Sequence, residues 1–518
     1  MRHPGDRQAA PARLVACFVA IVLLLCGLAG CASTEHARYT DSDVFKCEPG
    51  APTEVSAHPG RQAAPRPPGP TLHIIEFDDQ GWPFPAPGAT ENASPSFRID
   101  CAIDDIAGRL KRDRRKVLIF VYVHGWQHTA APGDRDLDRF RATLAAQQKR
   151  HGSDRDVIGI YVGWSGRTLD FPGLAWTTFY SRKNAAHHIA EGSVRELFVR
   201  LQAMRNRWNR NSVAQRIGVT TCDRDKRPIT GPDCPIRTVM TGHSFGAWIL
   251  YASTAPYIMQ TLAGGTSPAR QEPEAQEETG AGTDAPKDSP DTERERGIAD
   301  LILLINPAFE ATRYNAVFNA ARAYRNRRFE PPLLVSITST ADQATASLFP
   351  AARTLNTVLQ HSPPTDMERK AIRRTHGHME RYLSHELVLD QPWPAGPDYQ
   401  PCADATAGSG PRAALARRQY VCALQRHDAG MLPARPLERH FCGGLRLTWL
   451  ANPDVDPFSV VWNIRTHGNV IPDHSSIHEP PMEYLVEQLY EDTGALPRFD
   501  LTRGSPSGAQ TVLADCGE

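Results

Sequence analysis

Apolar residues along this 518-residue chain follow two alternating patterns, one typical of strands and one typical of helices. Short apolar runs with little polar interruption are typical of parallel strands that are buried on both faces of a sheet. Such runs occupy residues 72–77, 116–123, 157–162, 237–241, 301–305, 333–337 and 458–464. They predict a sheet of at least these strands.

Helical spacing separates the apolar runs. Leu137, Phe140 and Leu144 lie three and four residues apart, as on one face of a helix. A longer stripe predicts one long helix and consists of Ala190, Val194, Leu197, Leu201, Met204 and Trp208. Met482, Leu485 and Leu489 mark a terminal helix. Strands that alternate with helices through right-handed crossovers predict an α/β fold with a doubly wound, mostly parallel sheet.

Two segments interrupt this alternation within the domain predicted over residues 71–495. Residues 264–297 contain almost no large apolar side chain, which predicts a disordered insert. Residues 349–456 are expected to form a lid or cap, with His376, His378 and His385 in a helical region. No carboxylate or cysteine completes a familiar metal-ligand spacing with these histidines, so no metal site is predicted.

Composition adds few constraints. The chain carries 58 Lys and Arg against 58 Asp and Glu, and this balance gives no indication of a nucleic-acid partner. Its length suits one large domain with insertions, or two domains. Prolines and small residues over 31–70 predict an extended tether, and residues 496–518 are assigned to a C-terminal tail.

The N-terminus has the features of an export signal. Three arginines precede an apolar run, residues 14–28, that is too short and wrongly flanked for a membrane-spanning helix. The run ends in Leu28-Ala-Gly-Cys31, which resembles the lipobox of bacterial lipoproteins. That resemblance implies removal of residues 1–30, a lipid on Cys31, and a place in the outer membrane facing the periplasm. A plain secretory signal and a retained signal anchor are the alternatives.

Cysteine content agrees with export. Of the 11 cysteines, two lie in the signal and Cys31 would carry the lipid, which leaves eight. An even number in an oxidising compartment predicts up to four disulfides. Cys222 and Cys234 are the pair that we predict from sequence proximity, because turn-forming residues separate them. No Cys-x-x-Cys spacing is present, so a zinc or redox pair is not predicted.

One turn between a strand and a helix carries the candidate chemistry. The strand over 237–241 is followed by Gly242-His243-Ser244-Phe245-Gly246 and then by an apolar run. Glycine on both flanks lets a serine take a strained conformation at the strand end. The pattern resembles the nucleophile elbow of the α/β-hydrolase superfamily, specifically its serine esterase and lipase branch. The alternative is a glycine-rich turn without catalytic meaning.

The resemblance implies a serine, an acid and a histidine in that chain order. Ser244 is the expected nucleophile and Asp342, after the strand over 333–337, is the expected acid. Asp342 has a helix N-cap as its alternative role, and Glu310 is the second candidate acid. His474, in a polar loop before the terminal helix, is the expected base. His467 and His478 are the alternative histidines.

A second motif follows the strand over 116–123. His124-Gly125-Trp126 resembles the oxyanion loop of lipases and esterases. The resemblance implies that the backbone amides of Phe245 and Trp126, or that of Gly125 in place of Trp126, stabilise a tetrahedral oxyanion. The alternative for the His124 and Trp126 side chains is that they fill core space.

These motifs predict a lipid-anchored serine hydrolase that cleaves a carboxylic ester through an acyl-enzyme. The expected partners are a small-molecule or lipid ester and the membrane, with no nucleic acid and no metal or organic cofactor. An acyltransferase or a peptidase would use the same residues. A non-catalytic envelope protein that keeps the fold as a binding scaffold is the alternative from another class. The completeness of the triad separates the two classes.

Overall fold

The computed structural model describes residues 69–85, 94, 96–167, 179–209, 234–263, 297–324, 331–357, 363–390, 411–428, 430, 436–441 and 443–495. The predicted signal, Cys31, the C-terminal tail and all but the last residues of the tether and of the insert lie outside this set. Predictions about them therefore stay predictions.

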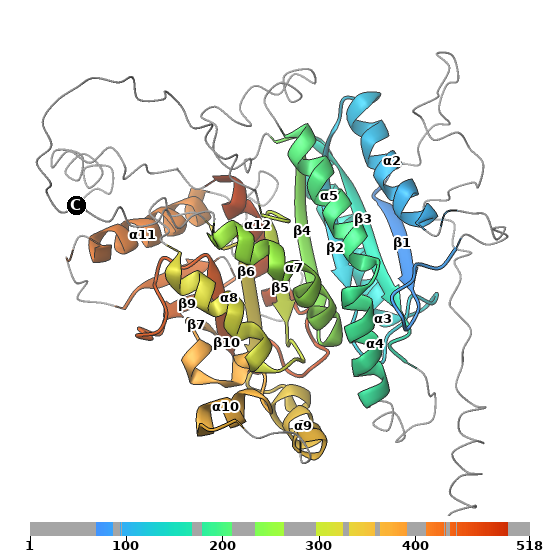
Figure 1. Cartoon of the computed structure of the whole chain (residues 1–518). Helices are drawn as coiled ribbons and strands as arrows, with labels where there is room; N and C mark the ends of the chain where they lie inside the picture. Colours follow the sequence, from blue (N-terminus) through green and yellow to red (C-terminus); the bar gives the residue numbers. More distant parts are fainter. Residues whose placement is uncertain are drawn as a thin grey trace, which may run out of the picture.

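The core of the molecule is a ten-stranded sheet in the order β1-β3-β2-β4-β5-β6-β10-β7-β9-β8 (Figure 1). Neighbours pair in parallel from β1 to β7, whereas β9 runs antiparallel to β7 and to β8. The seven strands that the sequence predicts are β1 (Thr71–Phe77), β2 (Lys116–Val123), β3 (Arg155–Trp164), β4 (Ile236–His243), β5 (Leu301–Ile305), β6 (Leu334–Ser339) and β10 (Val461–Thr466). The expected α/β class with a mostly parallel sheet is confirmed.

Strand β2 shows why such runs are almost continuously apolar. Alternate side chains of the strand enter two different apolar clusters, one on each face of the sheet. Val117, Ile119, Val121 and Val123 pack on one face, and Leu118, Phe120 and Tyr122 on the other. All seven are buried, so both faces of the strand exclude water.

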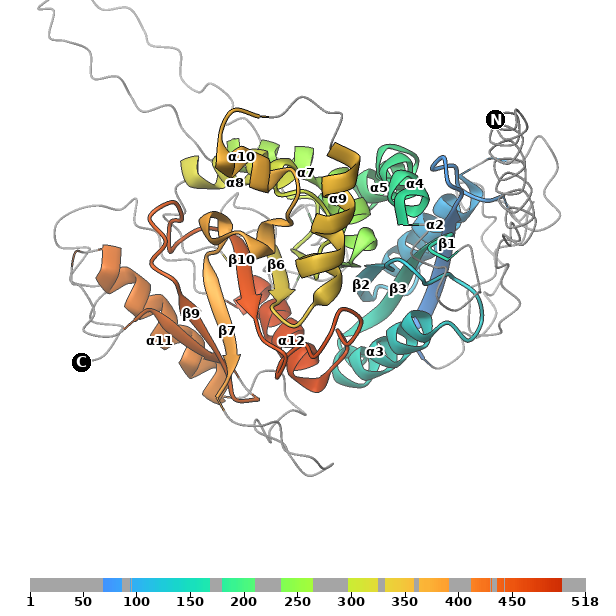
Figure 2. The ribbon, with the colours of Figure 1, turned by 90° about the horizontal axis from the view of Figure 1, so that it is seen from below.

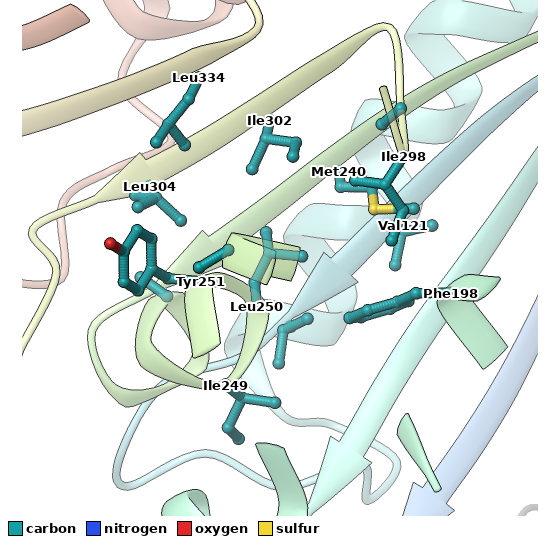
Figure 3. Packing of buried hydrophobic residues seen from close by; sticks show 14 of the residues in the cluster. Val121, Phe198, Met240, Ile249, Leu250, Tyr251, Ile298, Ile302, Leu304 and Leu334 are labelled. Atoms are coloured by element: carbon teal, nitrogen blue, oxygen red, sulfur yellow. The ribbon is translucent and has the colours of Figure 1, made fainter. Parts of the chain in front are cut away.

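Helices cover both faces (Figure 2). The first face carries α2 (Phe97–Lys111), α4 (Phe179–Glu191), α5 (Val194–Trp208), α7 (Phe245–Ala263) and α8 (Ala311–Ala323). The second face carries α3 (Arg135–His151) and α12 (Pro480–Ala495). Figure 3 shows the first cluster, in which Phe198 of α5 and Leu250 of α7 pack with Val121 of β2.

The sequence predicted one long helix for the apolar stripe over 190–208, and this prediction is wrong: the stripe lies on two helices. Helix α4 ends at Glu191 and α5 begins at Val194. At the break, a Cβ on Gly192 would lie 2.7 Å from the carbonyl oxygen of Gly81. The amide of Ser193 donates to that same carbonyl over 3.0 Å. Both helices pack on one cluster, so the apolar spacing continues across the break.

Much of the segment expected to be a lid belongs to the sheet. Within it lie β7 (His385–Leu389), β8 (Glu438–Phe441), β9 (Leu445–Trp449) and α11 (Pro411–Asp428), which packs against β8. The physical reason is alternation in β7 and β9, which buries Leu387, Leu389, Leu445 and Leu447 against the second face. His385 therefore starts a strand, and the helical setting predicted for it is wrong.

The rest of that segment lies close to the loop after β6. The π-helix η3 (Ala344–Leu348) runs into α9 (Phe349–Thr357), and α10 (Asp366–Ala371) follows. Figure 1 shows α9 and α10 together at the lower end of the molecule. The 3₁₀-helices η4 (His376–His378) and η5 (Glu380–Tyr382) lead into β7.

Two further expectations touch the described residues. Cys101, Cys234 and Cys422 are disulfide-bonded, but Cys222 lies outside the described set, so its pairing with Cys234 stays a prediction. Within the described ranges, no helix is both long enough and apolar enough to cross a bilayer.

Candidate active site

Ser244 stands at the sharp turn between β4 and α7. Its φ is 55°, in the left-handed region that residues with a Cβ seldom adopt. The amide of Ser244 donates to the carbonyl of Ile305 over 3.1 Å, and its own carbonyl accepts from the amide of Ala308 over 3.2 Å. These bonds to the neighbouring strand end hold the strained conformation.

The two glycines of the turn permit close approach rather than unusual dihedral angles. A Cβ on Gly246 would lie 2.1 Å from the carbonyl oxygen of Val123. One on Gly242 would lie 2.7 Å from the Cα of Ala247. Neither glycine has a positive φ. The backbone of the loop after β2 and the turn around Ser244 therefore touch only because side chains are absent between them.

Three predicted site residues meet at this turn. Ser244 Oγ lies 2.8 Å from Nε2 of His474. His474 Nδ1 lies 2.9 Å from Oδ1 of Asp342. The carboxylate is fully buried, whereas the imidazole is 21% exposed. An imidazole that donates from Nδ1 to the carboxylate has Nε2 available to accept the serine proton.

The surroundings of Asp342 keep it ionised. Its Oδ1 accepts from the amides of Ala344 and Thr345, at 2.9 and 3.2 Å, and its Oδ2 accepts from the Thr345 hydroxyl. Burial alone would raise the pKa of this carboxyl, but the contact with His474 and the bonds from Thr345 lower it below the usual value. The hydrogen bonds from the Ala344 and Thr345 amides are those that a helix N-cap residue accepts. Asp342 therefore caps the helical segment that follows it and also contacts His474.

His378 belongs to the same network, which the sequence did not suggest. Its Nε2 lies 2.9 Å from the hydroxyl oxygen of Thr345. Because that hydroxyl gives its proton to Asp342, its oxygen accepts from the imidazole N–H. Burial lowers the pKa of His378, so the ring stays neutral at pH 7. The sequence pattern predicted only that His378 lies in a helical region of the expected lid. In the described structure, no group of His, Cys, Asp and Glu is arranged to bind a metal.

The loop after β2 presents backbone amides beside Ser244. His124 Nε2 accepts from the amide of Trp164 over 3.1 Å, which leaves its proton on Nδ1 for the carbonyl of Gly125, 3.0 Å away. Burial lowers the pKa of His124 to about 4, so this tautomer persists at neutral pH. In a trans peptide the amide of Trp126 is directed opposite to that carbonyl, away from His124.

Packing places this peptide next to the nucleophile. A Cβ on Gly125 would lie 3.0 Å from the Cβ of Ser244. No described residue accepts a hydrogen bond from the amide of Trp126. The amide of Phe245 is the first in α7 and has no intrahelical acceptor. The structure thus brings both predicted oxyanion donors close to Ser244.

The alternative residues lie elsewhere. Glu310 is buried among Lys183, Arg313 and Arg353, with contacts of 3.1 Å to Arg313 and 2.9 Å to Arg353. His467 contacts Glu386 and Thr340, at 3.2 Å each. His478 lines a pocket between α3 and α12, with Tyr122, Phe140 and Met482. Within the part of the chain that the structure describes, no hydrogen bond or ion pair joins any of these three residues to Ser244.

Buried histidines make the fold sensitive to acid. Burial lowers the pKa to about 4 for His124 and His478, and to about 3 for His243, His376 and His385. In the unfolded chain these groups have a pKa of about 6.5. The unfolded state therefore binds protons first as the pH falls, and stability is lost between about pH 6.5 and the folded-state values.

At pH 5 this linkage amounts to roughly 2 kcal/mol for each histidine, enough for five of them to unfold an ordinary domain. We expect the melting temperature, followed by circular dichroism, to fall steeply from pH 7 to pH 5. Replacing His385 by glutamine should make the fall less steep. A melting temperature that is unchanged between pH 7 and pH 5 would contradict the assignment of these rings as buried and neutral.

In chemical terms the site combines a hydroxyl, an imidazole that contacts it and a carboxylate that contacts the imidazole, with two backbone N–H groups beside the hydroxyl. Such a set can carry out acyl transfer. No protein-family model, curated protein or solved structure matches the chain significantly. The chemistry assigned to the site therefore depends on its own geometry.

Proposed function

We propose that this protein is a serine hydrolase that cleaves carboxylic esters through a covalent acyl-enzyme. The observation that carries the proposal is the contact series from Ser244 to His474 and on to Asp342, at 2.8 and 2.9 Å. The lipobox resemblance supports placing the enzyme in the bacterial envelope on a lipid anchor. The α/β-hydrolase resemblance of the motifs is compatible with the observed sheet.

In the first half of the proposed reaction, His474 Nε2 removes the hydroxyl proton of Ser244 as Oγ attacks the ester carbonyl. The negative charge that develops on the carbonyl oxygen is stabilised by the amides of Trp126 and Phe245. Asp342 keeps the imidazole in the tautomer that accepts this proton and stabilises the imidazolium. The imidazolium then protonates the departing alcohol, and the acyl group remains on Ser244.

In the second half, water attacks the acyl-enzyme. His474 takes a proton from the water, and the same two amides stabilise the second tetrahedral intermediate. Collapse of the intermediate releases the carboxylic acid, and the proton returns to Oγ of Ser244. The residues finish in their starting protonation states.

Aromatic rings next to the nucleophile favour an ester with an apolar group. Phe179 has ring contacts with Trp126 at 5.6 Å and with Phe245 at 5.1 Å. The Phe349 ring centroid lies 6.3 Å from that of Phe179. Phe245 and Phe349 are buried, whereas Trp126 and Phe179 are partly exposed, so these two rings would offer apolar contact area to a substrate at Ser244.

The test is a panel of p-nitrophenyl esters of rising chain length, incubated with the full chain in detergent. We expect saturable release of p-nitrophenol, with higher kcat/KM for butyrate or longer esters than for acetate. Adding a primary alcohol and measuring its ester distinguishes acyl transfer from hydrolysis. A folded protein that turns over none of these esters would contradict the proposal.

Thr345 offers a test of the acid. Thr345→Val keeps the shape of the side chain but removes the hydroxyl that donates to Asp342 and accepts from His378. A hydrogen bond to a charged group contributes about 1.5–3 kcal/mol, so kcat should fall roughly 10- to 100-fold. Thr345→Ser, which keeps the hydroxyl, should retain most activity. Equal kcat values for the valine and serine variants would remove Thr345 from the mechanism.

A further inference from the structure

The loop after β5 contacts the segments that carry all three proposed catalytic residues. The carbonyl of Ile305 accepts from the amide of Ser244 over 3.1 Å, and the amide of Ala308 donates to the Ser244 carbonyl over 3.2 Å. Between these two residues lies Asn306, which is fully buried. The nucleophile is thus fixed, through its own backbone, to the residues on either side of Asn306.

The side chain of Asn306 reaches the other two segments. Its Oδ1 accepts from the amide of Ser339 over 3.0 Å. Ser339 ends β6, three residues before Asp342. The Nδ2 of Asn306 donates to the carbonyl of His474 over 3.1 Å, with a longer contact of 3.4 Å to the carbonyl of Asp473. One amide group therefore connects the acid segment with the base segment.

Asparagine suits this position for two physical reasons. The backbone of Asn306 has φ 45°, in the left-handed region that asparagine tolerates better than most residues with a Cβ. The two contacts also require an acceptor and a donor on the same short side chain. Aspartate keeps the acceptor but has no N–H, and at neutral pH it would direct a charged oxygen at the His474 carbonyl.

The His474 carbonyl has a second donor. His243 Nε2 lies 2.8 Å from it. Burial, with a smaller contribution from the neighbouring His474 ring, lowers the pKa of His243 to about 3, so the ring stays neutral at pH 7. Because a carbonyl only accepts, the proton of the ring lies on Nε2. The ends of β4 and β5 therefore hold the same carbonyl, and with it the backbone from which the catalytic imidazole extends.

We propose that Asn306 is a positioning residue that keeps His474 and Asp342 in reach of Ser244, with His243 as the second support of the His474 backbone. This inference rests on the proposed function. Without the Asn306 bonds, the His474 carbonyl keeps, among the described residues, the bond from His243 alone. Because a shift of about 1 Å in a catalytic group can cost 100-fold in rate, the loss appears in kcat rather than in substrate binding.

The test compares Asn306→Asp with Asn209→Asp. Asn209 is also fully buried, and its side chain likewise bonds a backbone carbonyl and an amide, both of Ile236, at 2.8 and 2.9 Å. Ile236 begins β4, whereas Ser244 follows the other end of the same strand, so this control lies at the opposite end of β4 from Ser244. Both substitutions disturb a buried amide, and only the first touches the candidate site.

We expect Asn306→Asp to lower kcat on a p-nitrophenyl ester 10- to 100-fold, with KM changed less than threefold and a parallel fall in the rate of labelling by a fluorophosphonate. Asn209→Asp should lower the melting temperature but leave kcat per folded molecule unchanged. Equal kcat per folded molecule in wild type and Asn306→Asp would overturn the positioning role alone. A wild-type protein that neither hydrolyses esters nor takes the label would overturn the proposed function and this inference with it.

If Asn306→Asp does not fold, Asn306→Ser provides the second variant, because serine keeps a short donor and acceptor. It should retain more activity than Asn306→Ala. The same kcat for serine and alanine, both equal to wild type, would again exclude the role.

Discussion

Ser244→Ala is expected to lower the rate of ester hydrolysis by roughly 10⁴- to 10⁶-fold, because the remaining groups cannot form an acyl-enzyme. The residual rate would come from the oxyanion donors and from substrate binding. Loss of one hydroxyl that bonds a partly exposed imidazole should leave the melting temperature within a few degrees of wild type. The measurement is kcat/KM on the best p-nitrophenyl ester, alongside a thermal melt.

Ser475→Ala is the matched control for this variant. Ser475 is an exposed serine directly after His474, and its hydroxyl takes no part in the proposed reaction. Its replacement should leave kcat/KM within about twofold, since exposed substitutions have small effects. Near-normal turnover by purified Ser244→Ala would show that another group attacks the ester.

His474→Ala should reduce activity about as much as loss of the nucleophile, because members of a triad act as a unit. The same change at His467 or His478 should reduce it far less, since neither ring contacts Ser244. All three variants keep the rest of the loop, so they form a matched set. The measurement is kcat/KM for each at pH 8, where the buried histidines are neutral and the fold is intact.

A result in which His478→Ala silences the enzyme and His474→Ala does not would reject the proposed base. His478 lies between α3 and α12 with Tyr122 and Met482, so such a result would require a different arrangement of the loop in the active protein. Equal, small losses in all three variants would mean that no histidine of this loop carries the proton.

The sequence predicted the parallel strands other than β7, because each of them is buried on both faces of the sheet. A strand such as β2 contributes apolar side chains to two helical layers, and the resulting run is hard to mistake. The ends of these predicted strands also indicated where the site lies, because Gly125, Ser244 and Asp342 each follow the C-terminal end of one of them. The resemblance to the α/β-hydrolase motifs, with their order of serine, acid and histidine, then implied Ser244, Asp342 and His474, which lie in contact in the structure.

The missed elements have weaker local patterns. Strands β7 and β9 are five residues long. Polar residues alternate with leucine in β9, whereas β7 begins with His385 and Glu386 and has only three apolar residues. The break before α5 depends on Gly81, which is distant in sequence from Gly192. An apolar stripe cannot show such a break, because both helices face the same cluster.

The supporting residues of the site were invisible to sequence reasoning for a related reason. His378 reaches Thr345 across 33 positions, and Asn306 reaches His474 across 168. Single histidines and asparagines are common on surfaces and in turns, so neither residue stands out in a sequence. Only the fold places them beside the carboxylate and beside the loop that carries the imidazole.

The most direct measurement is covalent labelling with a fluorophosphonate, followed by mass spectrometry of the tryptic peptides. The proposed mechanism predicts one phosphonate adduct, on Ser244, formed at least 100-fold faster in wild type than in His474→Ala, because the neutral imidazole activates the hydroxyl. Heat-unfolded protein should not react. A folded wild-type protein that stays unlabelled, or that carries the adduct on another serine, would contradict the account.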